Sequence, residues 1–363
     1  MVDAVPPASR LRAVAFHLPQ FHPCPENDAF WGAGFTEWRN VVRARPRFRG
    51  HLQPHLPADL GFYDLRLAEA RTAQAELARA YGIHGFCYYH YWFSGKKMLH
   101  APIDSYADNN NIRLKYMLCW ANENWTRSWD GLNKNVLLEQ KYEKGWEEEY
   151  ARDVSKYLSS ERYYKRGGKP VLQIYNVSAI PDCRKRIQNM RKVFHGLGVD
   201  EVEILAVLFY GGEKDADKYG VEGFSEFPPH RMRFIGASGY ELRDIEERFS
   251  GNIFSYGSVV TNKIAEINAE HVTDTELGVM CGWDNTARRR SSADIFHGST
   301  PAVFREWFKA AYTASEKRAS KNKNSIVFVN AWNEWAEGTY LEPDMKYGRG
   351  YLEAIRSVTL ENR

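Results

Sequence analysis

Short apolar segments alternate with segments of helical spacing along almost the whole chain, and this alternation constrains the fold more than any other feature. The apolar segments are rich in β-branched and aromatic residues, as strands buried on both faces are. Eight strands with helices between them predict an α/β fold of the (β/α)8 TIM-barrel type. The expected strands lie at residues 13–18, 85–91, 115–120, 170–175, 203–210, 221–227, 278–283 and 326–329.

The connections between these strands favour one closed barrel. A long loop rich in Pro, His and Trp follows the first strand and extends to about Asp64. An open doubly wound sheet is the alternative, but no glycine-rich phosphate loop follows the first strand. We therefore expect residues 1–363 to form a single domain. The helices are expected at residues 65–81, 102–108, 146–159, 182–195, 259–267, 302–319 and 349–360.

Charge and hydropathy argue against several kinds of partner. The net charge of +3 and the pI near 8.4 are too mild to indicate nucleic-acid binding. The chain has no apolar run long enough to cross a bilayer, and residues 1–12 lack the apolar region of a signal peptide. We therefore expect no nucleic-acid partner, no membrane span and a cytoplasmic location.

The sequence contains one tight basic run, Arg288 to Arg290. A solvated loop is the expected structure for such a run. Contact with a phosphate or an anionic sugar is the alternative, because a guanidinium binds these groups through paired hydrogen bonds.

Aromatic and polar residues collect where the expected strands end. Aromatic residues make up 14% of the chain, with 11 Trp and 21 Tyr, more than packing alone usually requires. The carboxyl ends of the strands form the active face of a barrel, and sugar rings stack on aromatic side chains while their hydroxyls bond to amides and carboxylates. The residues expected to bind an oligo- or polysaccharide substrate are His17, His90, Tyr91, Trp92, Trp120, Asn122, Glu123, Trp125, Tyr210, His230, Trp283, Asp284, Asn333 and Trp335.

The last expected strand leads directly into two glutamates. Residues 325–343 have the sequence SIVFVNAWNEWAEGTYLEP, which contains Glu334 and Glu337. If the backbone turns helically after Trp332, residues three apart share a face, with Cβ atoms about 5–6 Å apart. The carboxyl groups of a retaining glycosidase are about 5 Å apart. Acidic residues are also common in first helical turns for electrostatic reasons alone, but the adjoining aromatic rings favour Glu334 and Glu337 as catalytic residues.

Other polar residues have structural explanations that are at least as good. Glu37, in the sequence GFTEW, is expected to hold the first long loop in place. His17 and His22 lack acidic or thiol partners at the spacing of a zinc site, so we expect no metal. His90 could equally be a structural histidine. No other cofactor is expected.

Five sequence blocks carry a resemblance to a known family. In this order they resemble the WbsX proteins, also described as glycoside hydrolase family 99-like, from about Ala13 to Tyr351. The blocks are FHLPQFHPCPENDAFWGAGFTEW (16–38), HLQPHLPADLGFYDLR (51–66), YGIHGFCYYHYWFSGK (81–96), LCWANENWTRSWDG (118–131) and AWNEWAEGTYLEP (331–343).

This resemblance implies a TIM barrel that acts on glycans. The hydrolase family comprises retaining endo-α-1,2-mannosidases with an Asn-Glu-Trp-x-Glu motif, which matches Asn333, Glu334, Trp335 and Glu337. By resemblance, Glu334 is the base toward the substrate's 2-hydroxyl, giving a 1,2-anhydro sugar. Glu337 is then the general acid and afterwards the general base toward water. Such an acid must be protonated at neutral pH, so its pKa must be raised by burial or by the other carboxylate.

Two departures from the hydrolases leave the reaction open. Ala336 stands where those hydrolases have histidine. The hydrolases also work in secretory or extracytoplasmic settings, whereas residues 1–12 of this chain lack the apolar region of a signal peptide. WbsX-type proteins are instead described as glycosyltransferases of O-antigen or cell-surface polysaccharide assembly. A retaining hydrolase or transglycosylase is the first hypothesis, a glycosyltransferase the second, and a non-catalytic glycan-binding barrel the third.

A second acid pair competes within the enzyme hypotheses. Asn122-Glu123 and Asn333-Glu334 are both Asn-Glu pairs at expected strand ends. Glu123 with Glu334 is therefore the alternative to Glu334 with Glu337. Carboxyl groups near 5 Å apart favour retention of configuration, and groups beyond about 6.5 Å apart favour inversion.

Overall fold

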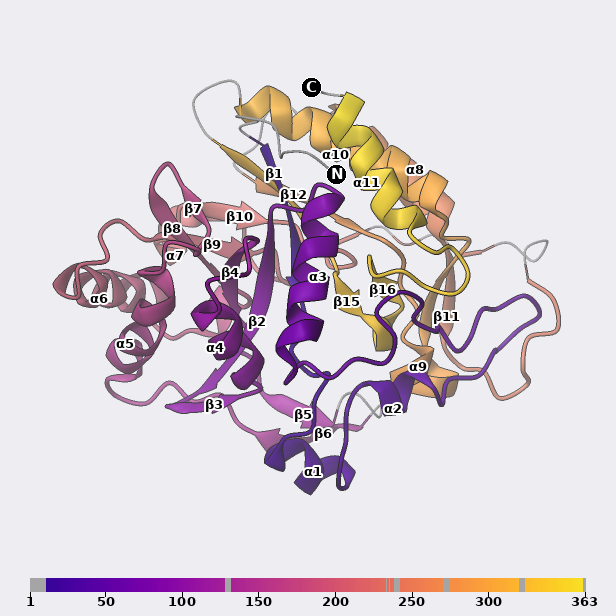
Figure 1. Cartoon of the computed structure of the whole chain (residues 1–363), viewed down its shortest axis with the longest axis horizontal. Coiled ribbons are helices and arrows are strands. Elements are labelled where there is room, and N and C mark those ends of the chain that lie inside the picture. The colour runs from indigo at the N-terminus through magenta and orange to yellow at the C-terminus, as the bar shows by residue number, and fades with distance from the viewer. Residues whose placement is uncertain are drawn as a thin grey trace.

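The structure, a computed structural model, describes residues 11–127, 132–232, 234, 236–237, 242–269, 275–319 and 324–361. Residues 128–131 of the fourth matching block and the first ten residues of the N-terminal segment lie outside this description. Within it, eight parallel strands form a closed barrel (Figure 1). The strands are β1 (Leu11–His17), β2 (Gly85–Phe93), β4 (Lys115–Trp120), β8 (Lys169–Ile174), β9 (Glu203–Val207), β10 (Gly223–Ser225), β12 (Thr275–Met280) and β14 (Ser325–Asn330).

The pairing of the strands closes the ring. Neighbours follow the order β1-β14-β12-β10-β9-β8-β4-β2, and β1 also pairs in parallel with β2, from Val14 opposite Gly85 to His17 opposite Tyr88. The expected (β/α)8 barrel is therefore confirmed. Strand β9 ends at Val207 rather than at Tyr210, because the Phe209 backbone N–H turns back to Val207 O after Leu208 N has made a last bond to Ser225 O of β10.

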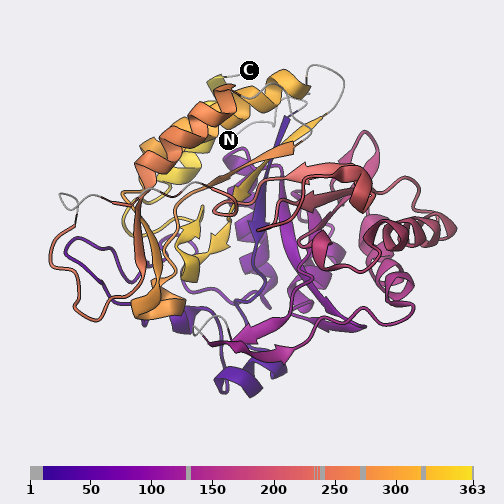
Figure 2. The same ribbon diagram turned by 180° about the vertical axis from the view of Figure 1, so that it is seen from behind.

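Helices cover the outside of the barrel, as Figures 1 and 2 show from opposite sides. Helices α8, α10 and α11 pack together on one side, and α5 packs against α6 on another. No helix in the described residues combines the length and apolar character that a membrane crossing requires. The helices between and after the strands are α3 (Ala68–Ala80), α4 (Ala101–Asp108), α5 (Trp146–Leu158), α6 (Cys183–Gly196), α7 (Ala216–Tyr219), α8 (Tyr256–Ala269), α10 (Pro301–Ala319) and α11 (Gly350–Glu361).

The short elements lie mostly in the loops between these parts. They are α1 (Pro25–Trp31), α2 (Trp38–Val41), α9 (Thr286–Arg289), β3 (Lys96–Met98), β5 (Trp125–Arg127), β6 (Leu132–Leu138), β7 (Lys165–Arg166), β11 (Asn252–Ser255), β13 (Asp294–His297), β15 (Asn333–Glu334), β16 (Thr339–Tyr340), η2 (Val177–Ala179), η3 (Arg290–Ser292) and η4 (Trp335–Glu337).

The core explains why the strand sequences are almost uniformly apolar. Every residue of β14 is buried, and Ile326 and Val327 are fully buried. A strand in a closed barrel has packed side chains inside and helices outside, so neither face contacts water. This arrangement accounts for the continuous apolar runs that predicted the strands.

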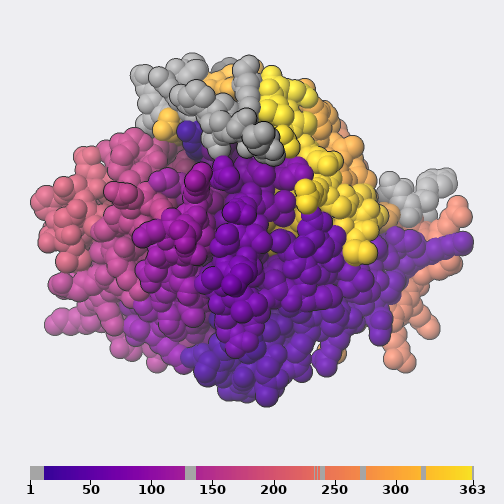
Figure 3. All heavy atoms as spheres, in the orientation of Figure 1, coloured from indigo at the N-terminus to yellow at the C-terminus, as the bar shows by residue number. Residues whose placement is uncertain are grey.

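The long loop after β1 covers one face of the molecule. It contains α1 and α2, and its indigo atoms occupy the lower part of the surface in Figure 3. Its tip lies beside residues 242–249, joined by a 2.5 Å ion pair from Arg47 to Glu246 and by a hydrogen bond from Arg49 N to Arg243 O. The loop is thereby fixed to a distant part of the chain.

Candidate active site

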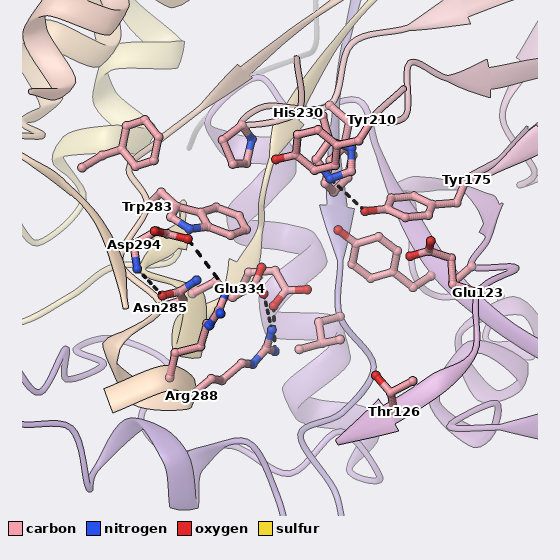
Figure 4. Close-up of a pocket in the computed structure, with 18 of the residues that line it drawn as sticks. Glu123, Thr126, Tyr175, Tyr210, His230, Trp283, Asn285, Arg288, Asp294 and Glu334 are labelled. Carbon is pink, nitrogen blue, oxygen red and sulfur yellow. Dashed lines mark hydrogen bonds and ion pairs between the residues drawn. The ribbon is translucent and has the colours of Figure 1, made fainter. Parts of the chain in front are cut away.

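A pocket of about 640 Å³ opens where the barrel strands end at their carboxyl side (Figure 4). Its walls come from residues that follow β1, β4, β8, β9, β10, β12 and β14, together with the end of β2. This is the face on which barrel enzymes carry their active sites. The residues expected from the sequence that line the pocket are Tyr91, Glu123, Trp125, Tyr210, His230, Trp283, Glu334 and Glu337.

Glu334 and Glu337 reach this pocket from a tight hairpin after β14. Strand β15 pairs with β16 in antiparallel register, and the 3₁₀ turn η4 connects them. A 3₁₀ turn has three residues per turn, so side chains three positions apart project in nearly the same direction. The expected helical turn is present in this tighter form, and both carboxylates line the pocket.

Asp284 fixes the backbone that carries Glu337. The Asp284 backbone N–H donates to Glu337 O over 2.7 Å. Gly338 ends the turn with φ near +62°, and a Cβ at this position would lie 2.8 Å from the Asp284 nitrogen. The Asp284 carboxylate accepts hydrogen bonds from His51 (2.6 Å) and Gln53 (2.7 Å). Burial acts to raise its pKa, but His51 and His55 hold that pKa below the usual value.

Arg288 joins the two candidate acids. Its Nη2 lies 3.1 Å from Glu334 Oε2, and its Nη1 lies 2.6 Å from Glu337 Oε1. Only 6% of its side chain is exposed. The expectation of a solvated loop is therefore wrong for Arg288, because α9 turns this side chain under the pocket while Arg290 is exposed.

A third carboxylate lies behind the guanidinium. Glu37 Oε2 accepts hydrogen bonds from Arg288 Nε (3.0 Å) and Nη2 (2.8 Å), and its side chain is fully buried. Glu37 Oε1 accepts a further bond from Asn40 Nδ2. The expectation that Glu37 holds the first loop in place agrees with these contacts, which tie α2 to α9.

Burial changes the protonation of the acid pair. It raises the pKa of Glu334 to about 8, although the Arg288 charge acts in the opposite direction. Burial also raises the pKa of Glu337, again against the effect of Arg288. Two carboxyl groups that interact this closely titrate as a pair. The pair therefore retains a proton at neutral pH.

Aromatic side chains form the wall of the pocket away from the acids. Tyr175 Oη lies 3.2 Å from His230 Nε2, and the His230 ring lies 4.0 Å from the Tyr210 ring. Burial lowers the pKa of His230 to about 3, so its imidazole is neutral at neutral pH. In Figure 4 Trp283 lies across the pocket from these three side chains. The cavity thus offers flat apolar surfaces on two sides.

Glu123 occupies a different part of the pocket from the acid pair. Figure 4 shows it beside Tyr175 and away from Glu334. Its Oε1 accepts a hydrogen bond from Asn176 Nδ2 over 3.3 Å, and burial raises its pKa. This carboxyl can accept sugar hydroxyls or act as an acid, but among the residues that the structure describes no guanidinium is seen to join it to Glu334 in the way that Arg288 joins Glu334 to Glu337.

Several expected site residues do not line the pocket but support it from behind. Asn333 Oδ1 accepts from Leu18 N (2.7 Å), and its Nδ2 donates to Leu18 O, which joins the ends of β1 and β14. Trp335 stacks on Tyr340 at 3.8 Å and donates from Nε1 to buried Glu342. Asn122 exchanges two hydrogen bonds with the Asn176 backbone.

The remaining expected residues lie in the core. His17 is fully buried, with Nε2 3.2 Å from Gln74 Oε1, and burial lowers its pKa to about 3. His90 lies 3.7 Å from Asp153, and burial lowers its pKa to about 4. Trp120 donates from Nε1 to Trp92 O between packed rings. Within the described part of the chain, no group of three or more His, Cys, Asp or Glu could hold a metal ion.

Sequence reasoning missed Arg288 as a pocket residue. The residues expected to bind substrate after β12 are Trp283 and Asp284, and Arg288 follows Asp284 by four positions, in α9. Arg288 thus lies about one helical turn beyond the expected residues. Its position beneath both acids still depends on how α9 packs against η4 and α2.

The chain has the fold of a class of TIM-barrel proteins that includes glycoside hydrolases, with a pocket of acids and aromatic rings at the carboxyl ends of the strands. A solved glycoside hydrolase-like protein matches 98% of this chain and 96% of its own, with a TM-score of 0.58 and 15% identity. The GH99 endo-alpha-mannosidase from Bacteroides thetaiotaomicron, in complex with BIS-TRIS propane, matches 96% of each chain, with a TM-score of 0.55 and 14% identity. At such low identity these similarities concern the fold alone.

The sequence comparison gives the family. The family model of the glycosyltransferase WbsX matches residues 13–355, and the chain belongs to this family, as its five blocks led us to expect. The protein WxcX of Xanthomonas campestris pv. campestris, strain B100, is 39% identical over 359 residues, and that of strain ATCC 33913 is 38% identical. Each match covers 98% of this chain but 50% of the relative, so the chain spans about half the length of these proteins. Family and fold together are those of carbohydrate-active enzymes.

Proposed function

We propose that the chain is a retaining glycoside hydrolase, or a transglycosylase with the same chemistry, that uses Glu334 and Glu337. Its substrate would be an α-linked manno-configured or related bacterial surface polysaccharide. One observation carries the proposal: the two carboxyls of a single turn converge on the guanidinium of Arg288 at the floor of a pocket with aromatic walls. Glycosidase chemistry requires two such groups close together, one of them protonated.

The proposed first step transfers two protons. Glu334, ionised, takes the proton from the sugar's 2-hydroxyl, and the freed oxygen attacks the anomeric carbon to give a 1,2-anhydro sugar. Glu337, protonated, gives its proton to the leaving glycosidic oxygen. In the second step Glu337 takes a proton from water or from a sugar hydroxyl that opens the anhydro ring, and Glu334 returns its proton to O2. Charge, atoms and protons balance over the cycle.

The raised pKa values leave one proton on the pair, and the exposures of the two side chains, rather than these pKa values, favour Glu337 as the residue that donates it. Burial keeps one proton on the pair at neutral pH, as a general acid requires. The side chain of Glu337 is 24% exposed and that of Glu334 is 7% exposed. The more exposed carboxyl can reach a leaving oxygen in the open part of the pocket, which favours Glu337 as the acid. Aromatic rings on two sides would stack on the sugars that flank the bond.

A glycosyltransferase is the second candidate, and the description of the family favours it. A transferase that uses a metal and a nucleotide sugar commonly binds them through an Asp-x-Asp pair. The chain contains Asp215-Ala216-Asp217, but these residues are not among those that line the pocket. Asp215 instead caps α7 by accepting from Lys218 N. A transferase reaction at this pocket would need another way to hold the diphosphate.

Product analysis tests the two candidates directly. Wild type, Glu334→Gln and Glu337→Gln are incubated with α-1,2-linked manno- and rhamno-oligosaccharides, with and without nucleotide sugars. We expect cleavage or transfer without nucleotide, lowered at least about 100-fold by either substitution. Glu123→Gln tests the alternative pair. If Glu123→Gln loses as much activity as Glu334→Gln while Glu337→Gln keeps the wild-type activity, the catalytic pair is Glu123 with Glu334. Transfer only when a nucleotide sugar is supplied would replace hydrolysis by glycosyl transfer.

A further inference from the structure

The contacts of Arg288 raise a question that the proposed chemistry leaves open. A guanidinium beside both acids favours their ionised forms, yet a general acid must keep its proton. If Arg288 acted alone on Glu334 and Glu337, it would oppose the reaction. The arrangement around the guanidinium must therefore limit its effect on the pair.

Glu37 provides that limit. It takes two of the hydrogen bonds that Arg288 donates, from Nε and Nη2, and no part of its side chain is exposed. Its own position is fixed, because Asn40 Nδ2 donates to its other oxygen over 3.0 Å and its backbone N–H bonds to Gln20 O. Glu37 and Arg288 thus form a buried ion pair of zero net charge directly beneath the two acids.

We propose that Glu37 and Arg288 act together as a positioning and charge-setting pair for the active-site carboxyls. Arg288 holds Glu334 and Glu337 on one guanidinium, and Glu37 neutralises that guanidinium so that one of the two carboxyls keeps its proton. Neither residue is catalytic, since both act through the acids. The part of this inference that concerns catalysis rests on the proposed function. The effect of the two residues on the protonation of Glu334 and Glu337 does not depend on it.

Counting the buried charges supports this division of roles. Three carboxylates and one guanidinium within hydrogen-bond distance would leave a net charge of two negative units in a buried site, which is costly without water. Protonating one member of the acid pair lowers that charge by one. With Glu37 removed, the guanidinium would favour ionisation of both acids. With Arg288 removed, all three carboxyls would favour protonation.

The other groups around the pair do not replace these two. Those that face the acids electrostatically from β2 and from the loops after β8 and β9 are phenols whose pKa lies above the usual value because of burial, so they are neutral. Arg289 and Asp294 also line the pocket, and they form an ion pair with each other at 3.8 Å. The phenols are those of Tyr89, Tyr91, Tyr175 and Tyr210.

A purely structural role for the ion pair makes a different prediction. Glu37 and Arg288 join α2 to α9, and both helices pack against η4, so either substitution would loosen the same contacts. Loosening would let water reach the acids and would move both variants in the same direction, toward the ordinary carboxyl pKa. Charge-setting instead predicts opposite directions, because the two side chains carry opposite charges.

The test is a titration of the acids without substrate. Glutamate labelled with ¹³C at Cδ is incorporated into wild type, Glu37→Gln, Arg288→Gln and Arg288→Lys, and the carboxyl resonances are followed by NMR from pH 4 to pH 10. Glu334→Gln and Glu337→Gln assign the two signals. We expect Glu37→Gln to lower the apparent pKa values of the pair by about 1 unit or more and Arg288→Gln to raise them. Arg288→Lys, which keeps the charge, should shift them less than Arg288→Gln.

Controls separate charge-setting from folding and from the proposed function. Arg305→Gln and Glu361→Gln break an ion pair between α10 and α11 and should leave the two resonances unchanged. Circular dichroism identifies variants that do not fold. If Arg288→Gln is one of them, Glu37→Gln is compared with Arg288→Lys, because charge-setting lowers the pKa values of the pair in Glu37→Gln and leaves them nearly unchanged in Arg288→Lys, whereas loosening lowers them in both. A shift upward or no shift in Glu37→Gln overturns the inference. Opposite shifts without any glycosidase activity would keep it and reject the proposed function.

Discussion

At the scale of single residues, burial and one guanidinium together decide how the two acids are protonated. An exposed glutamate would be ionised at neutral pH whatever its neighbours. Glu334 is buried, and its pKa rises to about 8 in spite of Arg288. The same sequence in a solvated helix would have carried two ordinary carboxylates. The chemistry of the site therefore depends on its depth as well as on its residues.

This raised pKa makes the stability of the protein depend on pH. Below pH 4.5 Glu334 is protonated in both the folded and the unfolded chain, and its full contribution to stability is present. As pH rises to about 8, the unfolded chain ionises at Glu334 while the folded chain stays protonated, so stability is lost across this window. Urea unfolding at a series of pH values should show a decline, on the order of a few kcal/mol, that is absent in Glu334→Gln. Parallel curves for the two proteins would contradict the raised pKa.

Activity should follow the same proton. On the basic side, kcat of the wild type should fall as pH rises through about 8, because the pair then loses the proton that the leaving group needs. The pH profile of kcat with a saturating oligosaccharide measures this limb. Glu37→Gln should move the limb to lower pH, in the direction expected from the titration. A basic limb at the same pH in both proteins would mean that the proton that controls kcat is not the one held by the acid pair.

At the scale of elements, the turn that carries Glu337 depends on close packing against the loop after β12. Gly338 has a positive φ and lies against the backbone of Asp284, which in turn holds Glu337 O. An alanine at this position would need both a left-handed backbone and space that Asp284 occupies. The hairpin and the loop after β12 therefore act as one unit.

Two glycine substitutions separate backbone strain from this packing. Gly298→Ala also replaces a glycine of positive φ, but nothing lies within 4 Å of its added Cβ, so we expect a cost of about 1–2 kcal/mol from strain alone. Gly338→Ala should cost more and should also lower kcat, because Glu337 must shift. Urea unfolding and steady-state kinetics measure both effects. Equal losses of stability for the two variants, with unchanged kcat, would show that the contact with Asp284 is unimportant.

At the scale of the whole molecule, a largely buried network of ion pairs and the pocket of the proposed chemistry lie at opposite ends of the barrel. The pocket lies at the carboxyl ends of the strands, whereas Arg166 joins Glu203 and Glu276 near the amino ends of β9 and β12. Glu276 also accepts from Arg318 at 3.0 Å. Such a separation is usual in barrel enzymes.

Breaking this network should lower stability without affecting catalysis. Arg166→Ala leaves two largely buried carboxylates without this partner, and we expect a loss of about 3 kcal/mol or more. Lys169→Ala, which breaks an exposed pair with Glu201, should change stability by less than about 1 kcal/mol. Thermal unfolding measures both, and kcat of Arg166→Ala should equal that of wild type at temperatures where it is folded. A loss of kcat there would mean that the two ends of the barrel are coupled.

Much of the fold and part of the candidate site followed from local patterns. The apolar run at 326–329 predicted β14 because a strand buried on both faces must be apolar throughout. The same logic placed Glu334, Glu337 and Trp283 near the active face, and all three line the pocket. It did not distinguish them from His17 or Trp120, which also follow or end strands but point into the core. Position along a strand specifies the end of the barrel, and the direction of a side chain depends on what packs around it.

What the sequence by itself determined is the alternation of strands and helices, the closed barrel that this alternation favours, and the delivery of two glutamates at the end of β14. These follow from periodicity and from the burial of apolar side chains, which are properties of short segments. Only the tertiary structure decided that Arg288 lies beneath both acids and that Glu37, 251 residues away, neutralises it. A buried charge cannot remain without a partner, and which partner it finds depends on contacts between loops that no local pattern specifies.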